Sequence, residues 1–315
     1  MLTFVAKRLL ALIPIFLGLS LIVFVIMALI PGDQALAILG NYATQDSLAS
    51  LRVELGLDRA LPARYFIWLG NILHGDLGRS YSLNRPVLDE VVERFGATLI
   101  LAGAAFILCA IWGVLAGIIS AARQNGLADR LVTVLVLVGI SVPSFWLGLL
   151  LILLFAVRLH WLPASGMFEI YGGGGVVDLA RHLILPAATL SVVASGVIAR
   201  LTRAGMLEAL RQDYIRTARA KGVAEGTVIL RHALSVAFVN ILPLLGVQAG
   251  FVLSGAVYVE TVFQWPGVGL MLFNAIATRD ILLVQGGVLV VAASYVLLNL
   301  IADILQHALD PRIRI

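Results

Sequence analysis

Charged residues are scarce in this chain of 315 residues. Only 13% are Asp, Glu, Lys or Arg, whereas 61% are hydrophobic. A soluble domain carries about 25% charged and roughly 45–50% apolar residues. The chain has too few polar side chains to cover a water-exposed surface, which excludes a soluble enzyme and a disordered chain. The mean hydropathy of +1.02 indicates a protein surrounded largely by lipid.

Cysteine and catalytic motifs are also nearly absent. Cys109 is the single cysteine, so an intrachain disulfide and a thiolate metal site are excluded, and we expect a packed core thiol. The five histidines lack a metal-binding spacing such as HExxH, and no P-loop (GxxxxGK[ST]) or GxSxG motif occurs. The sequence therefore predicts no catalytic residue, no metal and no cofactor bound by this chain. An intramembrane hydrolase would need a nucleophile and a base facing each other, and no such pair stands out.

Long apolar stretches are abundant. A helix that crosses the hydrocarbon core needs about 20 predominantly apolar residues. The first stretch is longer than the apolar region of a signal peptide, so we expect it to be a retained span. The sequence predicts an all-α integral membrane protein with six transmembrane helices at Leu9–Ile30, Gly96–Ala121, Leu131–Val157, Leu183–Leu201, Val236–Val259 and Ile281–Gln306.

The distribution of basic residues predicts the orientation, because Lys and Arg collect in short cytoplasmic loops. With the N-terminus inside, the short outer loops keep only Arg158, Arg181 and Arg279. Both termini are then cytoplasmic, and the net charge of +4 needs no nucleic-acid partner. The cytoplasmic set is Lys7, Arg8, Arg123, Arg130, Arg200, Arg203, Arg211, Arg216, Arg219, Lys221, Arg231, Arg312 and Arg314.

The same reading predicts four regions. Residues 1–31 form the N-terminal membrane helix, 32–95 an external loop, 96–306 a five-helix core with a cytoplasmic loop at 204–235, and 307–315 a cytoplasmic tail. Within the external loop, Pro86 occupies a first-turn position and acidic residues follow it. Five apolar residues fall on one face, so we expect an interfacial helix there that leads into the second span; they are Val87, Leu88, Val91, Val92 and Phe95.

Ionisable residues are missing from the middle of the predicted spans. Arg200, Asp303 and Glu260 all lie toward span ends. An ion-coupled secondary transporter acting alone is the alternative function, and it normally needs a buried carboxylate. Uncharged polar residues could instead line a substrate path, or they could form hydrogen bonds between helices. The path candidates are Ser141, Ser144, Ser191, Ser195, Asn240, Gln248 and Ser254, together with Glu260.

The connection between the fourth and fifth spans is the most distinctive segment. It is helix-forming up to Lys221, Gly222 suits a left-handed helix cap, and a second short helix is expected from about Ala224. Two short helices bent at a glycine between two spans would form a rigid lever. Composition alone also fits a basic cytoplasmic loop lying at the lipid headgroups.

This segment resembles the coupling loop of binding-protein-dependent ABC transporter permeases. Tyr-Ile-Arg-Thr-Ala-Arg-Ala-Lys-Gly-Val at 214–223 and Leu-Arg-His-Ala-Leu at 230–234 are most similar to the dipeptide/oligopeptide/nickel branch. Of the general pattern, Glu-Ala-Ala, Gly and Ile-x-Leu-Pro, only Ala218, Gly222 and Leu234 match literally. Other segments, distributed along the chain, also resemble that branch; they lie at 55–58, 75–80, 141–148, 260–263 with 265–269, 279–280 and 310–314.

The resemblance implies a type I ABC importer permease fold in the inner membrane. The chain would form half of a path for peptides or similar small solutes, as a heterodimer with a second homologous permease. Two cytoplasmic ATPase subunits would carry ATP and Mg, and an external binding protein would deliver the substrate. The long first outer loop indicates the first of the two permease subunits. The implied ATPase-coupling residues are Tyr214, Arg216, Thr217, Ala218, Arg219, Ala220, Lys221, Gly222, Arg231, His232 and Leu234.

Overall fold

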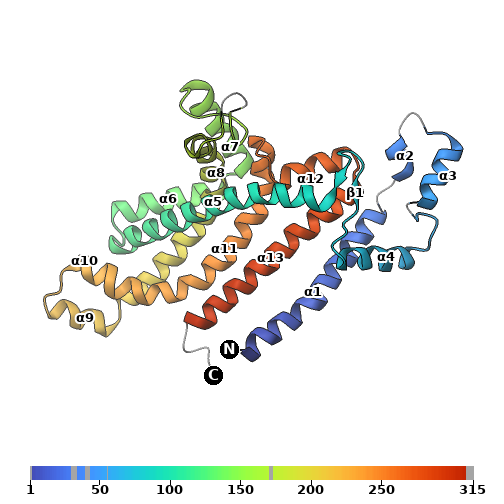
Figure 1. Ribbon diagram of the computed structural model, residues 1–315. Coiled ribbons are helices and arrows are strands. Elements are labelled where there is room, and N and C mark those ends of the chain that lie inside the picture. The colour runs from blue at the N-terminus through green and yellow to red at the C-terminus, as the bar shows by residue number, and fades with distance from the viewer. Residues whose placement is uncertain (1, 30–33, 40–42, 55, 170–172, 310–315) are drawn as a thin grey trace. The chain divides into compact units, whose positions relative to one another are not determined.

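Helices make up most of the described chain (Figure 1). The computed structural model describes residues 2–29, 34–39, 43–54, 56–169 and 173–309. The α-helices are α1 (Leu2–Leu29), α2 (Gln34–Leu39), α3 (Gln45–Glu54), α4 (Leu61–Leu73), α5 (Val87–Ala122), α6 (Leu127–Ser141), α7 (Ser144–Leu151), α8 (Val176–Leu210), α9 (Asp213–Ala220), α10 (Glu225–Thr227), α11 (Leu234–Phe263), α12 (Val268–Ala277) and α13 (Ile281–Leu309). Two π-helical segments, η2 (Ile152–Arg158) and η3 (Val228–Ala233), and two short antiparallel strands, β1 (Arg79–Ser80) and β2 (Arg85–Pro86), complete the described elements.

The long apolar helices confirm the predicted class of a helical membrane protein. Five described segments are long and apolar enough to cross a bilayer, and a bent pair of helices makes a sixth if the pair is counted as one span. The five are Arg8–Leu29, Val87–Ala122, Val176–Leu210, Ile241–Phe263 and Ile281–Ala302, and the pair is Leu127–Ser141 with Ser144–Arg158. All six coincide with the stretches that hydropathy predicts.

The third predicted span, Leu131–Val157, is not one straight helix. α6 and α7 meet at an angle of 105°. Val142 has extended backbone dihedrals (φ −79°, ψ 126°) and Pro143 follows it. A residue before proline is disfavoured in the α region, and proline has no N–H to continue the helical ladder. The break therefore follows from Pro143.

The helix predicted at 86–95 is present and leads directly into the second span; its interfacial location stays a prediction. Residues 87–95 are the first turns of α5, which continues without interruption to Ala122. Gly96 does not end the helix, because a single interior glycine costs only about 1 kcal/mol. Val87 and Val91 are buried, whereas Leu88 and Val92 are exposed, so only part of the predicted apolar face is covered.

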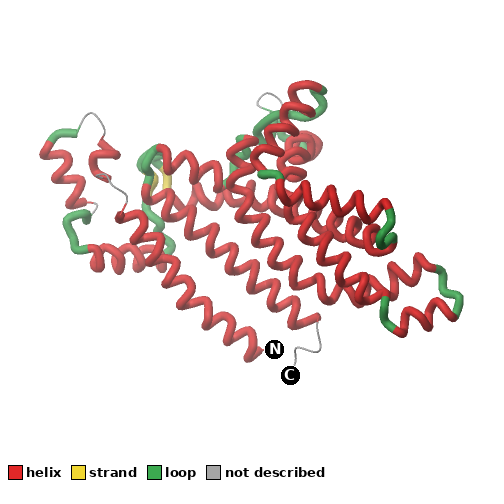
Figure 2. The backbone as a smooth tube through the Cα atoms, turned by 180° about the vertical axis from the view of Figure 1, so that it is seen from behind, coloured by secondary structure: helices red, strands yellow, loops and turns green. Residues whose placement is uncertain are grey.

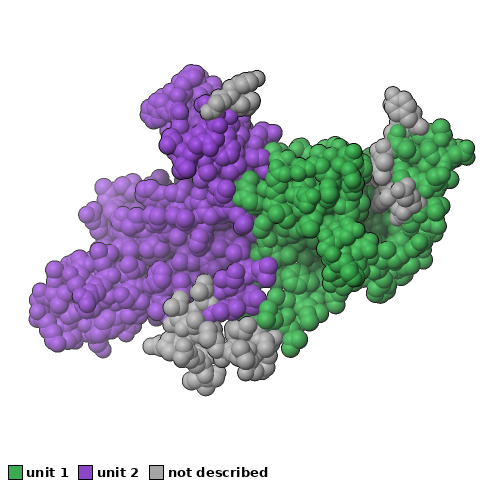
Figure 3. Space-filling model, in the orientation of Figure 1, with its two compact units in different colours: residues 1–97, 267–296 green, residues 98–266, 297–315 purple. Residues whose placement is uncertain are grey.

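The chain divides into two compact units (Figure 3). Unit 1 contains residues 1–97 and 267–296, and unit 2 contains residues 98–266 and 297–315. Helices α5 and α13 each pass from one unit to the other.

The core of unit 1 joins the start of α5 to α12 and α13. Its buried members are Met27, Val87, Val91, Val268, Met271, Leu272, Ala275, Leu283 and Val284. Beside this core, the fully buried Asp280 accepts hydrogen bonds from the Ser80 and Ser82 hydroxyls and from the Ser82 backbone N–H. The other carboxylate oxygen of Asp280 accepts from the Leu283 N–H at the start of α13. The β1–β2 hairpin is thereby anchored to the α12–α13 corner.

In unit 2, close contact between helices depends on small residues. A Cβ atom at Gly113 of α5 would lie 2.7 Å from Ile198 Cβ of α8, and one at Gly117 would lie 2.4 Å from Thr202 Cβ. Small residues four apart on one helix let two helix backbones approach closely, which is typical of membrane helix pairs. This packing holds α5 against α8, the helix that leads into the α8–α11 connection.

Candidate functional site

The candidate site is the connection between α8 and α11, which we call the corner segment (residues 211–234). α8 ends at Leu210, and the Gln212 N–H donates to the Ala209 carbonyl across the break. α9 then begins, and α10 and η3 lead directly into α11. Within unit 2, α9 and α10 form a turn at the ends of α8 and α11 (Figure 1). The structure confirms the two short helices that the sequence predicts here.

Gly222 closes α9 as the sequence predicts. Its φ is +76°, in the left-handed region that favours glycine. The Gly222 N–H donates to the Arg219 carbonyl at 2.9 Å, and the Val223 N–H donates to the Ala218 carbonyl at 3.2 Å. These two bonds are those of a Schellman cap, which satisfies the last carbonyls of a helix. The direction of the chain after α9 is therefore fixed by backbone hydrogen bonds.

A bidentate salt bridge joins α9 to α10 across this cap. Arg219 Nε lies 3.0 Å from Glu225 Oε2, and Arg219 Nη2 lies 2.5 Å from Glu225 Oε1. The guanidinium lowers the pKa of the Glu225 carboxyl, and the carboxylate raises the pKa of Arg219. Both side chains remain about half exposed, so the pair adds geometric definition more than free energy.

The inner face of the corner segment is packed into a hydrophobic core. Ile215 of α9 and Val228 of η3 are both fully buried. They pack with residues of α5, α8, η3 and α11, namely Ala121, Met206, Ala209, Ala233, Ala237 and Ile241. Because α9 and η3 contribute to one core with three long helices, both segments are fixed to the helix ends, and α10 lies between them.

The outer face of the corner segment is polar and mostly basic. The predicted coupling residues divide by face. Those exposed on the outer side are Tyr214, Arg216, Thr217, Arg219, Ala220, Lys221, Gly222 and Arg231, and those partly buried are Ala218, His232 and Leu234. The segment thus presents a rigid cationic surface of about two helical turns.

A buried ion pair beside this core was missed by the sequence analysis. Arg203 of α8 donates from Nε and Nη2 to the two carboxylate oxygens of Asp129, both at 2.8 Å. Ser120 Oγ of α5 and the Asn125 N–H also donate to Asp129, which is only 4% exposed. This four-donor cluster ties α5, α6 and α8 together. Its only sequence signal is an acidic residue in the first turn of a span.

The predicted path residues do not form one site. Ser191 and Ser195 of α8 line an apolar cavity of about 350 Å³ between α5, α6 and α8. Their hydroxyls donate to carbonyls of their own helix, at Ala188 and Ser191. Ser144 and Gln248 are half-buried, and Ser254 is exposed. The side chain of Asn240 lies outside the described residues.

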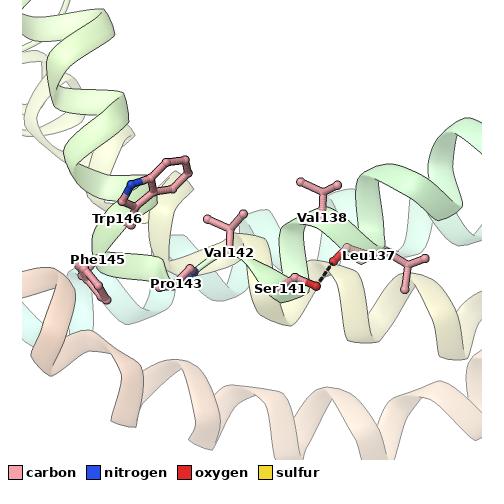
Figure 4. A pocket seen from close by; sticks show the side chains of 7 residues that line it. All are labelled: Leu137, Val138, Ser141, Val142, Pro143, Phe145 and Trp146. Atoms are coloured by element: carbon pink, nitrogen blue, oxygen red, sulfur yellow. Dashed lines mark hydrogen bonds between the residues drawn. The ribbon is translucent and has the colours of Figure 1, made fainter.

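Ser141 lies at a separate groove in the α6–α7 bend (Figure 4). The groove has a volume of about 580 Å³ and is lined by Leu137, Val138, Ser141, Val142, Pro143, Phe145 and Trp146. The Ser141 hydroxyl donates to the Leu137 carbonyl at 2.8 Å, and so it caps a carbonyl near the helix end. Trp146 projects over one side of the groove (Figure 4).

Glu260 is held in the interior at one end of α11. It is fully buried, and Oε1 accepts a hydrogen bond of 2.7 Å from Thr98 Oγ1 of α5. In this position the carboxylate joins two helices and is not exposed to a solute path.

Comparison with known proteins covers the whole chain. Residues 113–315 match the family described as binding-protein-dependent transport system inner membrane component, and residues 1–102 match the family described as the N-terminal part of such a membrane component. The Di/tripeptide transport system permease protein of Pseudomonas aeruginosa is 41% identical over 333 aligned residues, which cover 100% of this chain and 99% of that protein. The Glutathione transport system permease protein of Escherichia coli is 41% identical over 314 residues, with 100% and 99% covered.

Solved structures share the fold at low identity. An inward-facing structure of the MetNI methionine ABC transporter has a TM-score of 0.58 at 16% identity and covers 70% of this chain and 96% of that chain. A crystal structure of an amino acid ABC transporter with histidines has a TM-score of 0.52 at 16% identity and covers 71% and 94%. At this identity, both show a common fold.

Proposed function

Because this chain belongs to the family of inner membrane components of binding-protein-dependent transport systems, we propose that its corner segment is the surface on which ATPase subunits act. The chain is a permease subunit of an ABC importer, with the type I fold, in the inner membrane. It is a transport component and not an enzyme, and ATP is used by partner subunits. The family assignment also contradicts the alternative function, a secondary transporter acting alone.

The observation that carries the proposal is the rigid attachment of an exposed basic surface. The inner residues Ile215 and Val228 are buried with α5, α8 and α11, and Gly222 and the Arg219–Glu225 pair fix the angle between the short helices. A displacement applied to the outer face therefore moves the ends of three long helices. Reversing a two-state population from 1:99 to 99:1 requires about 5.5 kcal/mol of differential binding, which a stiff connection can transmit.

Charge reversal on the outer face tests this proposal. In the assembled transporter in lipid vesicles, Arg216→Glu and Lys221→Glu should lower both ATP-driven uptake and the co-purification of ATPase subunits by tenfold or more. Arg123→Glu is the matched control, because Arg123 is an exposed cation in the α5–α6 connection outside the corner segment. Uptake equal to that of the control would contradict the assignment.

The orientation proposed with this role places the corner segment and both termini in the cytoplasm. The concentration of Arg and Lys in this segment supports it, because short cytoplasmic loops retain basic residues. A cysteine introduced at Lys221 should react with a membrane-impermeant maleimide only in inside-out vesicles. Labelling in right-side-out vesicles would reverse the proposed topology.

The proposed cargo is a short peptide or a related small solute. The two relatives described above, each 41% identical, are named for di/tripeptides and for glutathione, and both align over the full chain. We place this chain as one half of the path, paired with a second homologous permease, with substrate delivered by an external binding protein. The buried Glu260–Thr98 contact offers no free charge to a solute, so selectivity belongs to the binding protein.

Direct binding and uptake measurements test the cargo. The purified binding protein should bind di- and tripeptides, and the same peptides should compete for uptake by the assembled transporter. Uptake that proceeds with no peptide-binding receptor, or a receptor that binds only non-peptide solutes, would refute this assignment.

A further inference from the structure

Helix α4 is an apolar helix that the membrane-span assignment leaves unexplained. With 13 residues it is too short to cross a bilayer, and none of its residues is buried in the protein. Pro62 lies in its first turn, where proline is favoured. Arg64 and Asn71 are its strongly polar residues, and the side chains of Phe66 and Leu73 are 68% and 78% exposed.

The contacts of α4 with α1 fix its position along the first span. Tyr65 Oη lies 3.0 Å from Ser20 Oγ. The Phe24 ring lies 5.4 Å from the Tyr65 ring and 5.5 Å from the Trp68 ring, measured between centroids. α4 runs across α1 near one end of that helix in both views (Figures 1 and 2).

These contacts lie inside the membrane span and not beyond its end. The described part of the span in α1 extends to Leu29. At about 1.5 Å per residue, Phe24 lies about 8 Å and Ser20 about 14 Å inside that end. Helices that lie in a membrane interface bury their apolar face about 5–10 Å into the boundary between headgroups and acyl chains. α4 is therefore at the depth of an interfacial helix.

The sequence of α4 places apolar and polar residues on opposite flanks. At about 100° per residue, Tyr65 and Trp68 face α1. Phe66 and Leu73 then fall on one side of that contact, and Asn71 falls on the other, near Arg64. An apolar flank opposite a polar one is the arrangement of a helix that lies parallel to the bilayer surface.

We propose that α4 lies in the lipid interface at the Leu29 end of α1, with its Phe66–Leu73 flank covered by lipid acyl chains. At this depth acyl chains already surround α1, and the apolar flank offers no polar group to a protein partner. The backbone of α4 is hydrogen-bonded within the helix, so contact with lipid leaves no backbone group unsatisfied. The proposal does not depend on the role of the corner segment.

Spin labels at single cysteines test the proposal in the assembled transporter in lipid nanodiscs. Cys109 is buried and is replaced by alanine, after which Phe66→Cys, Leu73→Cys and Asn71→Cys each provide one label site. Val25→Cys, on an exposed face of α1, is the lipid-facing control. We expect labels at 66 and 73 to collide with oxygen as at 25 and to be protected several-fold from a water-soluble nickel chelate. The label at 71 should show the opposite preference.

Two results would overturn the proposal. Labels at 66 and 73 that are as accessible to the chelate as the label at 71 would place α4 in water. Labels protected from both oxygen and the chelate would mean that another protein chain covers the flank. Assembly of each variant is checked by size-exclusion chromatography before labelling, so that a misfolded variant is recognised.

Discussion

At the scale of single residues, buried charges and one glycine determine local geometry in different ways. Asp129 forms its ion pair with Arg203, which is 74 positions later in the sequence. Gly222 acts through its own backbone, and its left-handed φ could be predicted because the helix-forming pattern ends there. The Asp129 pairing could not be predicted, since nothing in the sequence specifies which distant cation a carboxylate will meet.

Removing the Asp129 carboxylate should destabilise the permease. Asp129→Ala leaves Arg203 and two other donors without their acceptor, and breaking a buried pair costs about 3–5 kcal/mol. Arg203 is 32% exposed, so we expect the lower end of this range and a thermal midpoint reduced by several degrees. Circular dichroism of the complex in nanodiscs measures the change.

The matched control for this measurement is Asp213→Ala. Asp213 pairs with Arg216 at 3.5 Å, and both side chains are largely exposed, so its loss should cost less than about 1 kcal/mol. Equal midpoints for the two variants would show that the Asp129 cluster contributes no special stability.

The Arg219–Glu225 pair should respond to acid. Its carboxyl pKa lies below the ordinary value of 4.5, so the pair contributes fully above that value. The contribution is lost as the pH falls through the lowered folded pKa. A spin label at Lys221→Cys should become more mobile over that acid range.

Glu225→Gln isolates this effect. The label should be mobile at neutral pH in this variant and should gain no further mobility in acid, whereas Asp213→Asn should keep the wild-type response. An unchanged acid response in Glu225→Gln would assign the transition to another group.

At the scale of elements, hydropathy predicts where helices lie in the sequence but not the directions of their axes. The six predicted spans are present because burying about 20 apolar residues in lipid depends on composition alone. The 105° bend between α6 and α7 depends on backbone geometry, which hydropathy does not contain. Helices α4 and α12 are too short for a span criterion, although the proline in the first turn of α4 was a usable signal.

The angle between α9 and α10 should be required for coupling. Gly222→Pro imposes a negative φ where +76° is needed and removes the N–H that donates to Arg219. We expect ATP-driven uptake and the stimulation of ATPase activity by loaded binding protein to fall at least tenfold, with membrane insertion unchanged.

A graded series and a control accompany this variant. Gly222→Ala should lose less, because an L-residue in the left-handed region costs about 1–2 kcal/mol. Gly226→Ala, in α10 with open space around it, should transport normally. Normal uptake by the transporter that carries Gly222→Pro would contradict the proposal that the corner segment acts as a rigid lever.

At the scale of the whole molecule, the chain is one subunit of a larger transporter. The family assignment requires partners that use ATP, and the charged groups described in the interior are engaged. Glu260 bonds to Thr98, Asp129 to Arg203, and Asp280 to Ser80 and Ser82. Dependence on partner subunits for energy follows from the family assignment.

The purified chain alone should therefore not concentrate solute. In sealed vesicles with only a proton or sodium gradient, uptake should equal that of empty vesicles. Addition of the second permease, the ATPases, ATP and a loaded binding protein should produce accumulation, measured with a radiolabelled peptide. Gradient-driven accumulation by the lone chain would contradict dependence on partners.

The Asp280 anchor also has a consequence for biosynthesis. Ser80 and Asp280 are 200 positions apart, and ribosomes add about 5–20 residues per second. The hairpin at 79–86 is thus synthesised some 10–40 s before its carboxylate partner. During that interval, α5 begins from a hairpin that is not yet anchored, and a nascent chain that stalls before residue 280 would lack the acceptor that holds Ser80 and Ser82 in the finished permease.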